Sequence, residues 1–362
     1  MNLASILENQ DIEKRIAITP EIAKKYISLG FVLSLPNNYG AHLGFSDEDY
    51  KKLGVNFLDN EEEIIKNSDI IIQLGLPEEE KLTLFKDNQT LIGSLNVFLN
   101  KKKLENLKSN KINCFSLELL PRITRAQSMD ILSSQANLAG YKAVVEAFQV
   151  YEKAVPMMMT AAGTIPAAKV LVVGAGVAGL QAIATAKRMG AVVFATDVRM
   201  ASKEQVESLG GKFLTVEGSE NLETEGGYAK EASDEFKKKQ EELLSETLKK
   251  IDVIICTALI PGKEAPKIIK EDMFKNLQPG SVIYDLAAVQ GGNTVFTEVN
   301  KIVEKEGVKI LGEANILNKL SVSASNLYAK NVFNFVSNLY DKEKKKLNIN
   351  LEDEIIEKTL IK

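Results

Sequence analysis

The sequence contains one histidine, two cysteines and no tryptophan in 362 residues. His42, Cys114 and Cys256 are too few nitrogen and sulfur ligands to enclose a structural zinc ion within one chain, and we predict no metal site. A Ser–His or Cys–His catalytic pair would have to use His42, which lies in the glycine-rich sequence Asn-Tyr-Gly-Ala-His-Leu-Gly. A surface histidine in a turn is therefore the expectation. Both cysteines lie in apolar, strand-like segments, as buried free thiols do, so nothing requires an oxidising compartment.

An excess of positive charge and a long apolar run are also missing. Lysine and arginine number 45 against 49 acidic residues, a net charge of −4, which offers no basic face for nucleic acid. Residues 1–9 lack the cationic start and apolar core of a signal peptide. The longest apolar region, 154–186, is interrupted by Pro156, Gly163, Pro166 and Lys169 before it reaches the roughly 18 residues that a membrane-spanning helix needs. We expect a soluble cytoplasmic protein.

Apolar residues make up 45% of the chain, enough for real cores, and at roughly 150 residues per domain the length predicts two domains or three. Short apolar runs alternate with helical patterns, which favours parallel α/β structure. Strands are predicted at 31–35, 69–73, 90–95 and 112–117, and in a second set at 170–173, 192–196, 253–257, 281–285 and 308–311. Helices are predicted at 20–29, 61–67, 101–108, 130–154, 177–189 and 322–340.

Residues 216–250 interrupt this alternation. An acidic stretch at 217–225 is followed by a Gly-Gly-Tyr turn and a charged helical pattern. A connection of this length between two strands is either a functional lid or a solvated charged face, and composition alone favours neither.

The second set of strands contains a candidate phosphate-binding turn. The strand at 169–173 runs into Gly-Ala-Gly-Val-Ala-Gly, and a helical pattern follows. Gly174 permits a tight turn, Gly176 lets the backbone approach a pyrophosphate, and Gly179 allows close packing of strand and helix. The helix N-terminus supplies N–H donors and partial positive charge to the anion. The alternative is a Rossmann-like domain that has lost its nucleotide.

An acidic residue ends the following strand and bears on which nucleotide binds. Asp197 lies 18 residues beyond Gly179, where a carboxylate accepts hydrogen bonds from the ribose hydroxyls of NAD(H) and repels a 2′-phosphate. NAD(H) is therefore favoured over NADP(H). Arg199 complicates this inference, because an arginine can serve a 2′-phosphate.

Segments 121–141 and 174–186 closely resemble the proton-translocating NAD(P) transhydrogenases, in the NAD(H)-binding domain I of their alpha subunit. Alanine dehydrogenases are the related family. The resemblance implies two Rossmann-like domains with parallel sheets and a dinucleotide bound in the cleft by the second. We expect an N-terminal domain of residues 1–133 plus about 318–362, and a nucleotide-binding domain of 134–317 with a mobile loop at about 218–236. Further matching segments are 15–20, 195–199, 226–231, 257–262 and 283–292.

Three positions separate the two families. Alanine dehydrogenases carry a lysine, a histidine and an acid near the substrate, where this chain has Gln73, Asn96 and Val289. No general acid or base of suitable pKa remains at those positions. Arg15, which would meet a substrate carboxylate in that family, is present, but an arginine there equally serves to hold the fold together. A transhydrogenase needs none of these groups, because hydride passes directly between two nicotinamide rings and the protein has only to position them.

The resemblance also implies roles for individual residues. Arg122, Asp130 and Ser133 would surround the nicotinamide and its ribose, and Gln127 would face NADP(H) on a partner. Asp130 and Ser133 fall three apart on one helix face, with Arg122 and Gln127 on the preceding loop. The alternative is that Asp130 only caps the helix and pairs with Arg122. The loop at 218–236, with Gly227 and Tyr228 in it, would close over bound nucleotide.

The remaining residues of the NAD crevice are expected at the start of the helix predicted at 177–189 and at the ends of the strands predicted at 192–196 and 253–257. Asp285, at the end of the strand predicted at 281–285, is either a further site residue or a structural one. A homodimer is implied, together with NADP(H)-binding and membrane-spanning partner subunits that hold the chain at the cytoplasmic face of the inner membrane. The rival functions are an alanine dehydrogenase-like enzyme and a non-catalytic NAD-sensing module. The crevice residues are Val177, Val198, Arg199, Thr257, Ala258 and Leu259.

Overall fold

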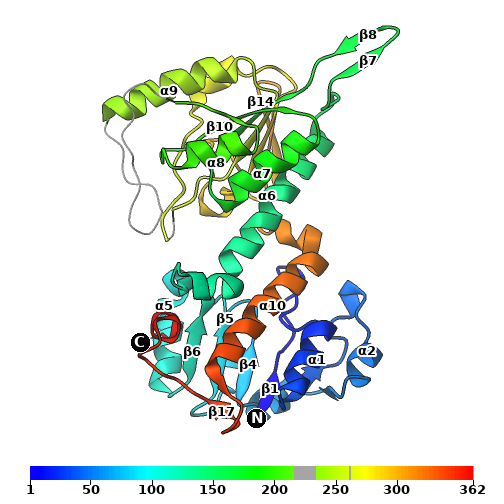
Figure 1. Cartoon of the computed structure of the whole chain (residues 1–362), viewed down its shortest axis with the longest axis vertical. Coiled ribbons are helices and arrows are strands. Elements are labelled where there is room, and N and C mark those ends of the chain that lie inside the picture. The colour runs from blue at the N-terminus through cyan, green and yellow to red at the C-terminus, as the bar shows by residue number, and fades with distance from the viewer. Residues whose placement is uncertain (216–233, 261, 362) are drawn as a thin grey trace. The chain divides into compact units, whose positions relative to one another are not determined.

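The two sets of strands form two separate parallel-stranded sheets in a computed structural model of the chain (Figure 1). The structure describes residues 1–215, 234–260 and 262–361. The chain divides into unit 1, Met1–Gln135 with Leu317–Lys362, and unit 2, Ala136–Ile316. The prediction of two Rossmann-like α/β units is confirmed.

Unit 1 is built on a sheet in the order β3-β2-β1-β4-β5-β6, whose neighbouring strands pair in parallel. The strand order reverses between β1 and β4, which is where open α/β sheets bind ligands. The strands are β1 (Asn2–Ala4), β2 (Val32–Pro36), β3 (Asn56–Leu58), β4 (Ile70–Ile72), β5 (Thr90–Gly93) and β6 (Asn113–Ser116). The helices are α1 (Pro20–Ser28), α2 (Asp47–Lys51), α3 (Glu61–Asn67), α4 (Glu79–Leu82), α5 (Val97–Ser109), α10 (Ser321–Leu339) and α11 (Glu354–Thr359).

Both faces of this sheet are buried, since successive strand residues point to opposite sides and those on each side join a hydrophobic core. In β4, Ile70 and Ile72 join a core with α1 and α10, whereas Ile71 joins a core with α3 and α5. The helix α10, which follows unit 2 in the chain, therefore completes a core begun by the N-terminal strands.

Unit 2 repeats the winding in the order β11-β10-β9-β12-β13-β15-β14, and its strand order reverses between β9 and β12. The edge strand β14 pairs antiparallel with β15. The strands are β9 (Lys169–Val173), β10 (Val192–Thr196), β11 (Lys212–Phe213), β12 (Val253–Cys256), β13 (Val282–Asp285), β14 (Lys301–Lys305) and β15 (Val308–Gly312). The helices are α7 (Val177–Arg188), α8 (Ser202–Ser208) and α9 (Asp234–Leu248). A hairpin of β7 (Met158–Thr160) and β8 (Gly163–Ile165) extends away from this sheet (Figure 1).

Several elements differ from the sequence predictions. The helix predicted at 130–154 is α6 (Ile131–Val150); the Tyr151 hydroxyl then donates to the Asp252 carboxylate. The helix predicted at 101–108 is the part of α5 that follows a kink at Asn100, and a short helical segment from Val97 precedes the kink. The strands β1, β3, β7, β8, β11 and β14 were not predicted, and neither were β16 (Tyr340–Asp341) and β17 (Lys346–Leu347). In the part of the chain that is described, no helix combines the length and apolarity of a membrane span.

Candidate functional site

The glycine-rich turn follows β9 and is tightly packed on its inner side. Gly174 has φ of +91°, which favours glycine, and a Cβ there would lie 2.8 Å from Thr257 Oγ1. A Cβ on Gly179 would lie 1.9 Å from the carbonyl oxygen of Gly174. Gly176 is different, because the nearest atom to a Cβ there is the Arg199 guanidinium at 4.0 Å. The turn is therefore closed at Gly174 and Gly179 and open at Gly176.

The open position lies at the start of α7. Gly176 occupies the N-cap in extended conformation, and among the described residues no side chain caps the helix. Val177, the first helical residue, is exposed. N–H groups at such an end are available to an anion, and the space over Gly176 lets one approach the backbone. This cradle fits the pyrophosphate of a dinucleotide.

Asp197 follows β10 and connects the turn to Arg199. Its carboxylate accepts from the Ala175 backbone N–H at 2.7 Å and from the Arg199 backbone N–H at 2.8 Å. The Arg199 guanidinium donates to both carboxylate oxygens, at 2.9 and 2.8 Å. Burial would raise the pKa of Asp197, but the hydrogen bonds from Arg199 and Ala175 outweigh burial and lower this pKa. Asp197 is thus an ionised acceptor at the edge of the turn.

The segment after β12 packs against the same glycine-rich turn. The Thr257 hydroxyl donates to the carbonyl oxygen of Gly174 at 2.9 Å, and the Ala258 N–H donates to the Asn293 side chain at 3.0 Å. Leu259, the next residue, is exposed. The predicted residues Val177, Asp197, Thr257 and Ala258 thus gather where the strand order of unit 2 reverses, as does Val198, which follows Asp197 directly.

The three residues predicted around the nicotinamide, and Gln127, predicted to face NADP(H), lie in unit 1, in or before the first turn of α6. Asp130 accepts from the backbone N–H of Ser133 at 2.9 Å and from its hydroxyl, so Asp130 caps α6. Arg122 and Gln127 are exposed. Gln127 lies on the 3-10 helix η3 (Thr124–Met129) rather than on the expected loop. Of the predicted lid, 218–233 lie outside the described residues, with Gly227 and Tyr228 among them, and 234–236 begin α9.

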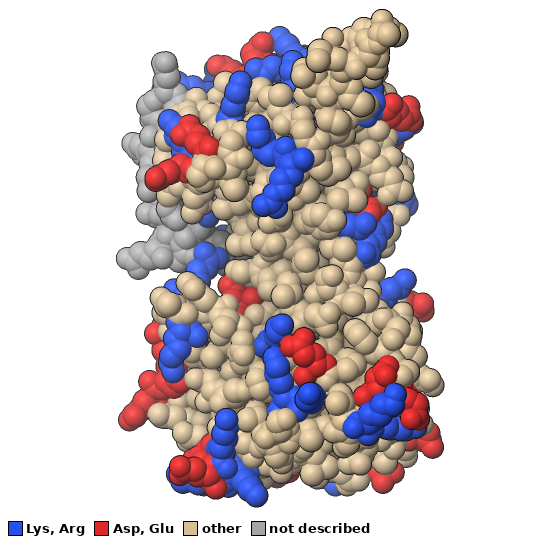
Figure 2. Space-filling model, turned by 45° about the vertical axis from the view of Figure 1, so that its right-hand side comes forward, with Lys and Arg blue, Asp and Glu red and all other residues tan. Residues whose placement is uncertain are grey.

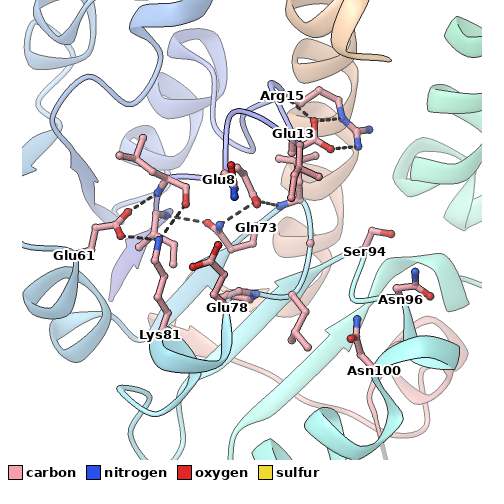
Figure 3. Close-up of a pocket in the computed structure, with 18 residues that line it drawn as sticks. Glu8, Glu13, Arg15, Glu61, Gln73, Glu78, Lys81, Ser94, Asn96 and Asn100 are labelled. Atoms are coloured by element: carbon pink, nitrogen blue, oxygen red, sulfur yellow. Dashed lines mark hydrogen bonds and ion pairs between the residues drawn. The ribbon is translucent and has the colours of Figure 1, made fainter. Parts of the chain in front are cut away.

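A cavity of about 650 Å³ lies at the carboxyl ends of β1, β4 and β5 in unit 1 (Figure 3). It brings together Arg15, Gln73 and Asn96, the three unit 1 positions used to compare the chain with alanine dehydrogenases. The Arg15 guanidinium donates to both Glu13 carboxylate oxygens, at 2.8 and 2.6 Å, and to Gln135 at 2.8 Å. Arg15 therefore holds the wall of the cavity together.

Gln73 is 1% exposed and is held by hydrogen bonds on both sides of its amide. Its oxygen accepts from the Ser5 hydroxyl at 2.8 Å and the Ile6 N–H at 2.9 Å, and its nitrogen donates to Glu8 at 3.0 Å. Burial raises the pKa of Glu8 to about 7. Glu8 is a titratable cavity residue that the sequence did not single out, because its contact with Gln73 spans 65 positions.

The scarce residues of the sequence lie where expected. His42 is exposed in the 3-10 turn η1 (Ala41–Leu43), where Nε2 contacts the carbonyl oxygen of Lys14 at 2.8 Å. Cys114 and Cys256 are buried free thiols, and burial raises the pKa of Cys114 to about 12. In the described part of the chain, no three His, Cys, Asp or Glu residues group as metal ligands.

Two doubly wound units, one with a glycine-rich turn that leads into a helix and an acid after the next strand, define a protein of the Rossmann class. Comparison with known proteins gives the family. The C-terminal domain of alanine dehydrogenase/PNT matches residues 143–362, and the N-terminal domain of alanine dehydrogenase/PNT matches residues 6–139. The chain belongs to the alanine dehydrogenase/PNT family.

The similar proteins include both transhydrogenases and alanine dehydrogenases. The chain is 48% identical to the first part of NAD(P) transhydrogenase subunit alpha of Rhodospirillum rubrum, over all of this chain and 96% of the relative. The crystal structure of transhydrogenase from Sinorhizobium meliloti superposes with a TM-score of 0.88 at 41% identity, covering 99% of this chain and 98% of that one. An L-alanine dehydrogenase structure shares the fold, with a TM-score of 0.81 at 20% identity over 99% and 94% of the two chains.

Proposed function

We propose that this chain is the NAD(H)-binding subunit of a proton-translocating NAD(P) transhydrogenase. In this proposal hydride passes directly between NADH on this chain and NADP⁺ on a partner subunit, while protons cross the membrane elsewhere. The observation that carries the proposal is the turn that is closed at Gly174 and Gly179 and open at Gly176, with Asp197 beside it. The similarity to transhydrogenase alpha subunits over the whole chain supports it.

Unit 2 would hold NAD(H) across its crevice. The backbone at Gly176 and Val177 faces the pyrophosphate, and Asp197 accepts from the adenosine ribose. Val198 and Arg199 border the adenosine, and Arg199 keeps Asp197 ionised. Thr257, Ala258 and Leu259 form the opposite wall, towards the nicotinamide ribose.

Unit 1 would supply the residues around the reacting ring. Arg122, Asp130 and Ser133 position the nicotinamide, its carboxamide and the adjoining ribose, and Gln127 faces NADP(H) on the partner. Bound NADH supplies the hydride, so the chain needs no proton-transferring group and contributes by positioning. We propose that the loop at 218–236, with Gly227 and Tyr228, acts as a lid over the nucleotide; residues 218–233 lie outside the described part of the chain.

The assembly would be a homodimer that joins the membrane only through NADP(H)-binding and membrane-spanning partner subunits, at the cytoplasmic face of the inner membrane. One feature of unit 2 suits self-association. The hairpin β7–β8 carries exposed Met158, Met159 and Ile165, with Met159 79% exposed, and the exposed Met157 directly precedes it. This projecting end of unit 2 is free of charged side chains in Figure 2. An exposed apolar surface of this kind marks an interaction site, and we assign it to a second copy of the chain.

Reconstitution tests the proposed activity. The chain is mixed with an NADP(H)-binding transhydrogenase subunit, and reduction of the acetylpyridine analogue of NAD⁺ by NADPH is followed spectroscopically. Activity above that of either protein alone is expected, and Arg122→Ala and Asp130→Ala should lower it. Absence of activity, when both nucleotides are shown to bind, would refute the proposal. NADH binding without any hydride transfer would favour an NAD-sensing module, whereas full activity of both variants would refute the roles assigned to Arg122 and Asp130.

An alanine dehydrogenase-like activity is the alternative, and one observation supports it. The cavity of unit 1 contains a titratable group, Glu8, although Gln73 and Asn96 offer none. Because Arg15 is already paired with Glu13, we expect poor binding of a substrate carboxylate. The purified chain with alanine and NAD⁺ should therefore form no pyruvate, and robust pyruvate formation would decide for the alternative.

A further inference from the structure

The loop that follows β13 is organised around one buried carboxylate. Asp285 is fully buried and accepts from the backbone N–H of Ala287 at 2.9 Å and of Asn293 at 2.7 Å. It also accepts from the Thr297 hydroxyl at 2.6 Å. Gly292, with φ of +82°, passes so close that a Cβ there would lie 2.8 Å from Asp285 Oδ2. Asp285 thus fixes the position of Asn293.

The side chain of Asn293 is turned toward the segment after β12. Its oxygen accepts from the Ala258 N–H at 3.0 Å, and its nitrogen donates to the Ala258 carbonyl oxygen at 2.8 Å. The same nitrogen donates to the carbonyl oxygen of Pro266 at 3.0 Å. A single amide therefore binds both backbone polar groups of Ala258 and ties them to a second point on the chain.

Ala258 in turn lies against the glycine-rich turn. Its backbone nitrogen is 3.2 Å from the position that a Cβ on Gly174 would occupy, and the neighbouring Thr257 hydroxyl donates to the Gly174 carbonyl oxygen at 2.9 Å. Continuous contacts run from Asp285 through Asn293 and Ala258 to Gly174. The place of Ala258 beside the glycine-rich turn therefore depends on Asn293.

We infer that Asn293 and Asp285 are positioning residues of the nucleotide site, acting on bound NAD(H) through Ala258. Asn293 is fully buried, so its side chain shapes the crevice wall rather than contacting the ligand. This inference rests on the proposed function, since it takes NAD(H) as the occupant of the crevice. It assigns Asp285 a role in binding through the loop that it orders.

The test compares NADH affinity among full-length variants, titrated by nicotinamide fluorescence at a temperature where circular dichroism shows each one folded. Asn293→Ala leaves two backbone groups of Ala258 without their partner and should weaken NADH binding about tenfold or more. Asn276→Ala is the matched control, because its amide donates to the Ser245 hydroxyl at 2.7 Å ahead of β13, not after it. It should bind NADH like the wild type.

A merely structural role would lower the melting temperature of Asn293→Ala and leave its NADH affinity unchanged, and that result would overturn the inference. If Asn293→Ala does not fold, Asn293→Asp carries the test. It retains the shape and the acceptor for Ala258 but loses both donations, to the carbonyl oxygens of Ala258 and Pro266, and weaker NADH binding is expected. Asp285→Asn should weaken binding less, and its effect should not add fully to that of Asn293→Ala. Wild-type protein that binds no NADH would overturn the proposed function together with this inference.

Discussion

Replacing either of two glycines of the same turn by alanine should have a different consequence: at Gly176 it should weaken NADH binding, and at Gly179 it should destabilise the fold. Gly176→Ala places a methyl group in open space, at φ of −77° and ψ of −167°, which alanine adopts readily. Gly179→Ala places the methyl group 1.9 Å from the carbonyl oxygen of Gly174 and 3.1 Å from Thr257 Oγ1. The first methyl group meets only an incoming ligand, whereas the second meets the protein itself.

The expected magnitudes follow from these distances. Overpacking against movable side chains costs about 1–3 kcal/mol, and the contact at Gly179 is with backbone, so we expect a loss of about 3 kcal/mol or more. The higher helix propensity of alanine offsets only about 1 kcal/mol of this loss in the free energy of unfolding. Gly179→Ala should therefore melt about 5 °C lower or more. Gly176→Ala should change stability by no more than about 0.5 kcal/mol and weaken NADH binding by at least about tenfold, or 1.4 kcal/mol.

Thermal unfolding of the apo protein and fluorescence titration with NADH measure the two effects separately. Gly75→Ala is the matched control, because a Cβ there also meets open space but lies in unit 1. Wild-type NADH affinity in Gly176→Ala would refute the assignment of the turn to the pyrophosphate. Normal stability of Gly179→Ala would show that the close packing of turn and helix is not needed for folding.

Three further predictions address the ribose acceptor, the cavity and the hairpin. Asp197→Ala should weaken NADH binding by about 1–3 kcal/mol in a calorimetric titration, because the Ala175 N–H loses its acceptor along with the ribose. Glu8 has its pKa raised from 4.5 to about 7, so protons bind the folded state more tightly and the free energy of unfolding should fall as pH rises between these values. Glu8→Gln should remove that fall, which is about 1–3 kcal/mol, in urea denaturation at pH 5 and pH 8. Met159→Asp should shift the sedimentation of the chain from dimer to monomer, whereas Leu99→Asp, at an 81% exposed residue of unit 1, should not.

The fold could be predicted from the sequence wherever an element is long enough to show its period. The strand predicted at 192–196 and the helix predicted at 61–67 coincide with β10 and α3, since each is bounded by turn residues. The strands β1 and β3 have three residues each, too few for an alternation to appear. β14 reads Lys-Ile-Val-Glu-Lys and is mostly exposed, so an apolar run does not mark this edge strand.

In the candidate site, too, features that depend on neighbouring residues could be predicted from the sequence, and contacts between residues far apart in the chain could not. The glycine turn is a local feature, because three glycines within six residues already determine a backbone path. The contact of Asn293 with Ala258 joins residues 35 positions apart, and an asparagine after two glycines otherwise indicates only a turn. Likewise, Arg15 and Gln73 stand out as individual positions, but only the fold shows that Glu8 lies beside them in one cavity.

The return of α10 to unit 1 has a consequence for synthesis on the ribosome. The core of unit 1 includes Tyr328, Val332 and Phe335, and the Tyr328 hydroxyl donates to the carbonyl oxygen of Gln73 at 2.6 Å. These residues emerge only after all of unit 2, which at about 5–20 residues per second takes on the order of ten seconds or more. The nascent first sheet must wait that long with one apolar face only partly covered, by α1 and α2, while the inserted unit can already complete its own core. Unit 2 should therefore be the first part of the chain to reach its native structure during translation, and unit 1 the part that depends on chaperones.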